Sequence, residues 1–196
     1  MDCPRVCIFD IDNTLTHGAT AKCKSPIDDV PPSWPESGGT TADVKRMISQ
    51  CVKKGYHIAI ATSESGMEQG LRYENKTQHD FIRSLDPTAD NSVFNDSFFA
   101  SEAFQGSCSV VKAIDRTGVP WCRDNEYHRK ETMIQNILNF YHVTPDCARY
   151  SYFFDDSVTH VATASSMGLK VVQSSPECGG VYCSEGCGIP ALHLVL

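Results

Sequence analysis

The chain has 196 residues, which suffices for one domain with a full hydrophobic core and leaves little room for a second. Its formal net charge of -7 argues against sequence-independent binding of nucleic acid, because neutralising a phosphate backbone requires a basic face. No apolar run approaches the roughly 20 residues that span a bilayer, and the N-terminal residues do not follow a signal-peptide pattern, so we expect a cytoplasmic protein.

The predicted elements alternate between apolar strands and helices. The first half of the chain predicts a strand over Val6–Phe9, a helix over about 41–54, a strand over Tyr56–Thr62, a weakly periodic helix over 65–85, a short strand around Phe98 and a helical turn over 110–116. The second half predicts a helix over Glu131–His142, a strand over Arg149–Phe154, a helix over Ser157–Met167 and a last strand from Leu169. Apolar strands separated by helices indicate a parallel sheet that is covered on both faces. We therefore expect a doubly wound α/β fold in a single domain, with a core over about 5–173 and a cysteine-containing tail over 174–196.

Acidic residues follow the ends of two predicted strands. In the stretch RVCIFDIDNTLT, Asp10 and Asp12 lie on the same side of an extended chain, where their charges repel each other unless a cation is near. Asp155 and Asp156 end another strand, and Thr62 ends a third. Because a doubly wound sheet binds its ligands beyond the carboxyl ends of the strands, we expect these residues to meet at one edge. The alternatives are a solvated turn for the first pair and a helix N-cap for the second.

This pattern predicts a metal site and phosphoryl transfer. Carboxylate ligands with few histidines nearby suit Mg²⁺, which keeps substrate phosphate in its coordination shell. Such a metal beside an aspartate at a strand end indicates a carboxylate nucleophile. A hydroxyl and a cation would hold the transferring oxygens, and Thr62 and Lys130 supply them. Ser63 is the alternative hydroxyl, and Arg129 and Lys112 are the alternative cations.

Four stretches, FDIDNTLT, IAIATS, RKETMIQNIL and YFFDDS, occur in this order. They resemble the four motifs of the haloacid dehalogenase superfamily of aspartate-dependent phosphatases, and the similarity extends from Val6 to about Val172. The resemblance implies a Rossmann-like sheet with a mobile turn and flap just after the first strand, at about 11–24.

The resemblance also implies a role for each motif residue. Asp10 would attack phosphorus and become an aspartyl-phosphate, and Asp12 would protonate the leaving oxygen and then take a proton from water. Thr62 would hydrogen-bond to the phosphoryl group, and Lys130 would stabilise Asp10 and the transferring charge. The acid at position 12 favours hydrolysis of phosphate esters over cleavage of carbon–halogen bonds, because the dehalogenase branch lacks it.

For the metal, the resemblance implies Mg²⁺ held by the Asp10 carboxylate, the Asp12 backbone carbonyl and Asp156, with Asp155 in support. Many relatives carry a further acid four or five residues after this acid pair, where the chain has His160 and no acid. How the fourth motif shares the metal stays open.

The ten cysteines raise the question of redox state. Because no export signal is visible, we expect reduced thiols, and Cys7 and Cys51 fall in apolar segments where free cysteine packs as a small hydrophobe. Four tail residues could bind zinc, although their spacing lacks a paired CxxC pattern, and free thiols or a disulfide are the alternatives. These residues are Cys178, Cys183, Cys187 and His193.

The substrate prediction depends on the lack of room for a large cap domain. Residues 15–39 are proline-rich and weakly periodic, and residues 105–128 leave room only for a small lid. The resemblance implies that a site without a cap takes a bulky phosphorylated substrate, a phosphoprotein or phosphopeptide that includes phosphotyrosine, or a small phosphate ester that a partner subunit admits. A small-metabolite phosphatase, a phosphotransferase and a non-catalytic phosphate-binding module are the alternatives. Membrane and nucleic-acid partners are not expected, and the oligomeric state stays open.

Overall fold

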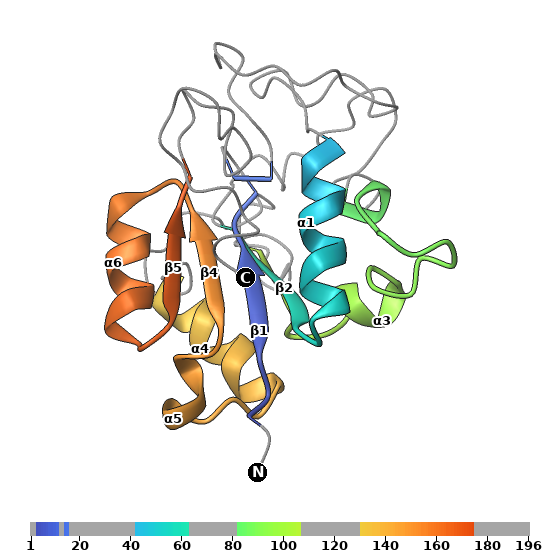
Figure 1. Ribbon diagram of the computed structural model, residues 1–196. Helices are drawn as coiled ribbons and strands as arrows, with labels where there is room; N and C mark the ends of the chain where they lie inside the picture. Colours follow the sequence, from blue (N-terminus) through green and yellow to red (C-terminus); the bar gives the residue numbers. More distant parts are fainter. Residues whose placement is uncertain (1–2, 12–13, 16–41, 63–81, 107–129, 175–196) are drawn as a thin grey trace, which may run out of the picture.

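A parallel sheet of five strands forms the centre of the protein. The computed structural model describes residues 3–11, 14–15, 42–62, 82–106 and 130–174. The strand order is β3-β2-β1-β4-β5, and every described pairing is parallel. The strands are β1 (Val6–Phe9), β2 (His57–Thr62), β3 (Phe104–Gly106), β4 (Tyr152–Asp155) and β5 (Lys170–Gln173). The expected α/β class with an all-parallel sheet is therefore present (Figure 1).

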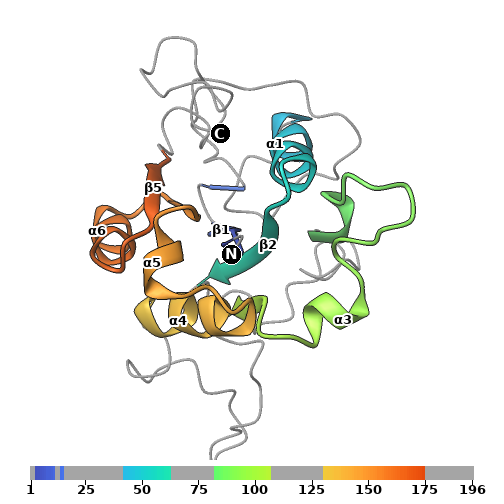
Figure 2. The same cartoon turned by 60° about the horizontal axis from the view of Figure 1, so that its bottom comes forward.

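The helices complete the two outer layers. They are α1 (Ala42–Lys53), α3 (Asp96–Phe99), α4 (Lys130–Phe140), α5 (Pro145–Ala148) and α6 (Val158–Ser166). Figure 2 shows α1 and α4 on opposite sides of the sheet. None of the helices in the described part of the chain has the length and apolarity that a membrane span requires.

The residues of strand β1 pack into two hydrophobic cores, one on each face of the sheet. All four of its residues are buried, and their side chains alternate between the faces of the sheet. Cys7 and Phe9 pack in the core that α1 covers, and the Phe9 ring stacks on Phe154 with the centroids 4.6 Å apart. Val6 and Ile8 pack in the core that α4 covers. The continuous apolar run is therefore the signature of a central strand with both faces covered.

The sequence located most of the regular elements correctly. The predicted helices over about 41–54, Glu131–His142 and Ser157–Met167 correspond to α1, α4 and α6, and the strands match β1, β2, β4 and β5 within a few residues. The glycines after α1 and α6 have positive φ angles of 75° and 88°, the left-handed conformation in which glycine commonly ends a helix.

The strand predicted around Phe98 is wrong. The segment forms the short helix α3, because the Asn95 side chain accepts a hydrogen bond from the Phe98 N–H (3.0 Å) and caps the helix. The Phe98 ring packs against the rings of Phe94, Phe99 and Phe104, so Phe98 belongs to a cluster of aromatic side chains and not to a strand. The strand of this region, β3, lies a few residues later.

The expectation of reduced thiols is wrong for one pair: Cys3 and Cys147 form a disulfide with their Cα atoms 5.4 Å apart. The register of β1 and β4 explains the pairing, since Cys7 lies beside Tyr152 and the two cysteines precede these residues by four and five positions. The start of β1 and α5 lie at the same lower end of the sheet in Figure 1. Cys7 and Cys51 are free and buried, as expected.

Several predictions concern parts of the chain outside the described residues. These are the flap except for residues 11 and 14–15, the 65–85 helix except for a helical turn at 82–84, the turn over 110–116, the lid except for residues 105–106, and the tail after residue 174.

Candidate functional site

Two neighbouring strands bring their acidic ends together. Phe9 on β1 lies beside Phe154 on β4, so the next residues, Asp10 and Asp155, are also neighbours. The Asp10 N–H donates to the Phe154 carbonyl at 2.9 Å and extends the pairing by one residue. The strand order reverses between β1 and β4, because the chain first builds the sheet outward from β1 to β3 and then resumes on the other side. This is the position at which open α/β sheets bind ligands.

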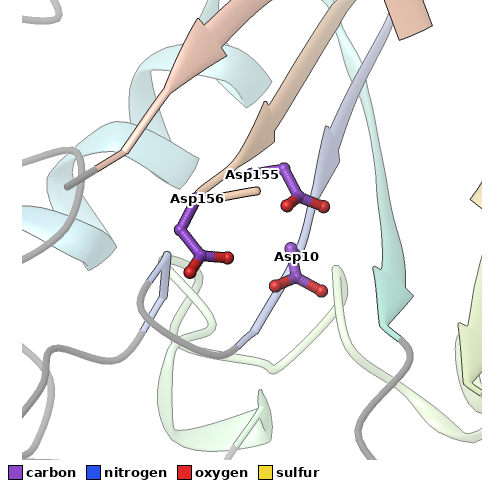
Figure 3. A group of neighbouring side chains, drawn as sticks. All are labelled: Asp10, Asp155 and Asp156. Atoms are coloured by element: carbon purple, nitrogen blue, oxygen red, sulfur yellow. The ribbon is translucent and has the colours of Figure 1, made fainter. Parts of the chain in front are cut away.

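Asp10, Asp155 and Asp156 form an acidic cluster at this edge. One carboxylate oxygen from each residue lies within 4.8 Å of the others. Asp10 and Asp155 are buried and Asp156 is half-buried. Figure 3 shows the three carboxylates gathered beside the ends of the strands. Like charges this close require a compensating cation.

Lys130, the first residue of α4, supplies part of that compensation. Its Nζ donates to Asp10 Oδ1 at 2.6 Å and to the Ala61 carbonyl at 2.6 Å, and it lies 3.0 Å from Asp155 Oδ2. The side chain is almost fully buried, so all three ammonium hydrogens have acceptors inside the protein. When all four groups are ionised, the three carboxylates and the one ammonium carry a net charge of two negative units, which one divalent cation would neutralise.

The ionisation of the three buried groups follows from these contacts. Burial raises the pKa of Asp10 to about 6, although the Lys130 charge opposes the rise. For Lys130, burial acts to lower the pKa, but the charges of Asp10 and Asp155 raise it above its usual value. For Asp155, burial acts to raise the pKa, but the His160 hydrogen bond and the Lys130 charge bring it below its usual value. At neutral pH the site therefore holds a protonated lysine between ionised carboxylates.

Asp155 accepts hydrogen bonds from α6 as well as from Lys130. Its Oδ1 accepts from the Ser157 N–H at 2.9 Å, and His160 Nδ1 lies 3.1 Å from Oδ1 and 3.2 Å from Oδ2. The N-cap of α6 is Ser157, so neither acid is the N-cap residue that the alternative expected, although the Asp155 carboxylate accepts from the Ser157 N–H. Asp155, at the end of β4, therefore connects the lysine with the start of α6.

Thr62 is the last residue of β2 and is completely buried. It follows Ala61, whose carbonyl binds Lys130, so its backbone lies one peptide from the lysine contact. The predicted hydroxyl residue thus lies at the same edge of the sheet as the acidic cluster.

Two buried hydroxyl residues at this edge were not predicted. Thr14 Oγ1 and Ser174 Oγ are hydrogen-bonded at 2.9 Å across 160 positions of sequence, and the Ser174 N–H donates to the Asp155 carbonyl at 3.0 Å. The Leu15 N–H donates to the Ile11 carbonyl at 2.9 Å, so Thr14 belongs to a turn that begins just after Asp10. Thr14 lies within FDIDNTLT and could have been chosen from that motif, whereas nothing in the sequence singles out Ser174.

The remaining predicted residues lie outside the described part of the chain. They are Asp12, Ser63, Lys112, Arg129, Cys178, Cys183, Cys187 and His193.

No protein-family model matches the chain, and no curated protein matches it. Of the four motifs quoted from the sequence, the structure brings the strand ends of the first, second and fourth and the lysine of the third to one edge of the sheet.

Proposed function

We propose that this protein is a Mg²⁺-dependent phosphatase that hydrolyses phosphate monoesters through an aspartyl-phosphate on Asp10. The observation that carries the proposal is the buried contact of Lys130 with Asp10 and Asp155, beside Asp156, at the carboxyl ends of β1 and β4. A purely structural salt bridge would not need the additional acid at the same place. The four motifs that resemble those of the haloacid dehalogenase superfamily favour the same chemistry.

The donor set of the acidic cluster fits Mg²⁺. Its described ligands are carboxylates, the oxygen donors that this hard cation prefers. The negative charge of the three carboxylates that Lys130 does not compensate is the amount that one divalent ion would neutralise. Asp10 and Asp156 would hold the ion, with the backbone carbonyl of Asp12 by resemblance. When bound, Mg²⁺ would neutralise phosphoryl oxygens and so allow an anionic ester to approach carboxylates.

The proposed reaction uses groups of the chain in two steps. A carboxylate oxygen of Asp10 attacks phosphorus, and the bond from phosphorus to the ester oxygen breaks while Asp12 gives that oxygen a proton. Water then attacks the phosphorus of the aspartyl-phosphate, passes a proton to Asp12 and releases inorganic phosphate. Lys130 keeps Asp10 ionised and oriented, and Thr62 would hydrogen-bond to the phosphoryl oxygens.

We propose a phosphoprotein or phosphopeptide as the substrate, because the chain has few residues for a cap that would enclose a small metabolite. A panel of phosphopeptides, including phosphotyrosine peptides, set against sugar and nucleotide phosphates tests this choice. Comparable kcat/KM values across the small metabolites would overturn it, and phosphate transfer to an acceptor other than water would identify a phosphotransferase.

The reaction itself is tested with p-nitrophenyl phosphate and the full chain. We expect turnover that disappears with EDTA, returns with Mg²⁺ and falls at least about a thousandfold in Asp10→Asn, because the nucleophile is lost. Asp90→Asn, which removes an exposed carboxylate elsewhere, is the matched control and should retain full activity. Acid-quenched enzyme should carry one hydroxylamine-sensitive phosphoryl group on the peptide that contains Asp10.

Two results would contradict the proposal. The first is unchanged turnover in Asp10→Asn. The second is no turnover with any divalent metal while phosphopeptide binding persists, which would identify a binding module.

A further inference from the structure

His160 lies in the first turn of α6 and contacts the acidic cluster from outside. Its Nδ1 is almost equidistant from the two oxygens of Asp155, at 3.1 and 3.2 Å. About a third of the His160 side chain is exposed, whereas Asp155 is completely buried. The histidine therefore joins the protein surface to the most buried carboxylate of the site.

The direction of this hydrogen bond follows from the chemistry of its partner. An ionised carboxylate only accepts hydrogen bonds, so His160 Nδ1 must carry the proton. The Ser157 N–H approaches one oxygen of Asp155 and Lys130 approaches the other. His160 alone bridges both oxygens among these three donors, and a bridging donor restricts rotation of the carboxylate about its terminal bond.

The orientation of Asp155 also matters for Lys130. The Lys130 ammonium is shared between Asp155 Oδ2 at 3.0 Å and Asp10 Oδ1 at 2.6 Å. A rotation of the Asp155 carboxylate would move one of the three acceptors of the ammonium and thus alter how it holds Asp10. The contacts form an unbroken series from His160 through Asp155 and Lys130 to Asp10.

We infer that His160 is a positioning residue, which orients the nucleophile Asp10 through Asp155 and Lys130. The inference rests on the proposed function for its catalytic meaning, but the orientation of Lys130 is a property of the protein without metal. A carboxylate at residue 160 would repel Asp155, whereas Nδ1–H stabilises it.

Three substitutions separate the hydrogen bond from the bulk of the ring. In His160→Asn the amide nitrogen occupies the place of Nδ1, three bonds from Cα, so the donor is kept. In His160→Gln the amide is one bond farther out, and in His160→Leu no donor remains. We expect kcat with p-nitrophenyl phosphate to stay within about threefold in the Asn variant and to fall about 10- to 100-fold in the other two, with little change in KM.

The control for this series is His57→Leu, at the opposite end of β2 from the site, which should keep the kcat of the wild type. Circular dichroism and thermal unfolding verify that every variant is folded. Equal kcat values in the Asn and Leu variants would overturn the inference.

NMR spectroscopy of the metal-free protein provides a readout independent of activity. Long-range ¹H–¹⁵N spectra should show the proton of His160 on Nδ1, and the ¹⁵Nζ signal of Lys130 should be retained in His160→Asn and shifted or broadened in His160→Leu. An unprotonated Nδ1, or an identical Lys130 signal in the Leu variant, would overturn the inference. If the wild-type protein is inactive, the proposed function is refuted. The ¹⁵Nζ signal of Lys130 then still tests whether His160 orients Lys130.

Discussion

Lys130 is the residue on which the charge balance of the acidic cluster depends. A buried ion pair contributes little net stability when it forms, because both charges lose their hydration. Removing one partner is different, since it leaves the other charge buried and uncompensated. Lys130 compensates two carboxylates at once, so the imbalance after its loss would be larger than for a single pair.

Lys130→Met keeps an unbranched side chain that is one atom shorter, and it removes the charge. We expect loss of phosphatase activity and a decrease of about 3–5 kcal/mol in the free energy of unfolding without metal. Saturating Mg²⁺ should restore part of the stability, because the ion supplies positive charge to the same carboxylates. Urea unfolding with EDTA and with Mg²⁺ measures both effects, and Lys53→Met on the exposed end of α1 is the control. Equal losses in the two variants would show that the charge of Lys130 is unimportant.

Asp10 gives the metal-free protein a distinct pH dependence. Burial raises its pKa from an ordinary 3.8 to about 6, so between these values the folded protein holds a proton that the unfolded chain has lost. Asp10 therefore makes the free energy of unfolding decrease as pH rises through this window. Asp155 has the opposite sign: its lowered pKa contributes stability that is lost in acid.

The Asp10 contribution can be isolated by comparison with Asp10→Asn, which cannot titrate. In EDTA, the stability of the wild type relative to the variant should fall from pH 4 to pH 6 and level off above pH 7. Urea unfolding across this range is the measurement. A difference that is constant with pH, or that rises, would mean that burial does not dominate the ionisation of Asp10.

At the level of elements, the sequence predicts strongly patterned segments and misses the short helix α3. Strand β1 is evident as a continuous apolar run, and α4 is evident because its apolar residues repeat with the helical period. Helix α3 has only four residues and depends on the Asn95 cap and on the aromatic cluster around Phe98. A pattern search has too few positions in such an element to distinguish it from a strand.

For the candidate site, the sequence predicted the residues at the ends of elements but not the side-chain contacts around them. Asp10, Asp155 and Lys130 each stand at the end or the beginning of a recognisable element, so topology alone brings them together. The contacts of His160 with Asp155 and of Thr14 with Ser174 depend on the side-chain geometry around these elements. That geometry is set by packing and by strand register, which the one-dimensional pattern does not contain.

The Thr14–Ser174 pair connects the turn after β1 with the end of β5. Each single substitution, Thr14→Val or Ser174→Ala, removes this hydrogen bond between two buried hydroxyls, and we expect a loss of roughly 1–3 kcal/mol. The double variant should lose less than the sum, because neither hydroxyl of the pair remains. Urea unfolding of the four proteins gives the interaction energy, and strict additivity would show that the bond does not stabilise the turn.

On the scale of the whole molecule, the acidic cluster and the disulfide lie at opposite ends of the sheet. The carboxyl ends of the strands carry the acidic cluster, and the opposite end carries the Cys3–Cys147 disulfide. The expectation of reduced thiols does not hold for this pair, because the pairing depends on β1 and β4 being neighbours, which no cysteine spacing reveals. The disulfide therefore lies far from the acidic cluster.

The disulfide should stabilise the fold substantially. It connects residues 144 positions apart, for which loop entropy in the unfolded chain predicts up to about 5 kcal/mol, with smaller values of about 2–4 kcal/mol being typical. Cys3→Ser should lower the free energy of unfolding by an amount in this range. Reductant should lower the stability of the wild type by this amount beyond any change that it causes in Cys3→Ser, which is the control. No change in either case would mean that the bond does not constrain the unfolded state.

Because the bridge joins Cys3 to Cys147, the backbone between them, including β1, β2, β3 and α4, forms a closed covalent circle. A protease that cuts this circle once opens it without separating the pieces. The nicked protein would migrate as one species on a denaturing gel without thiols and as two after reduction. In a variant with Cys178, Cys183 and Cys187 replaced by serine, a cut beyond Cys147 would release a fragment under either condition, so gel mobility would reveal on which side of the bridge a cleavage has occurred.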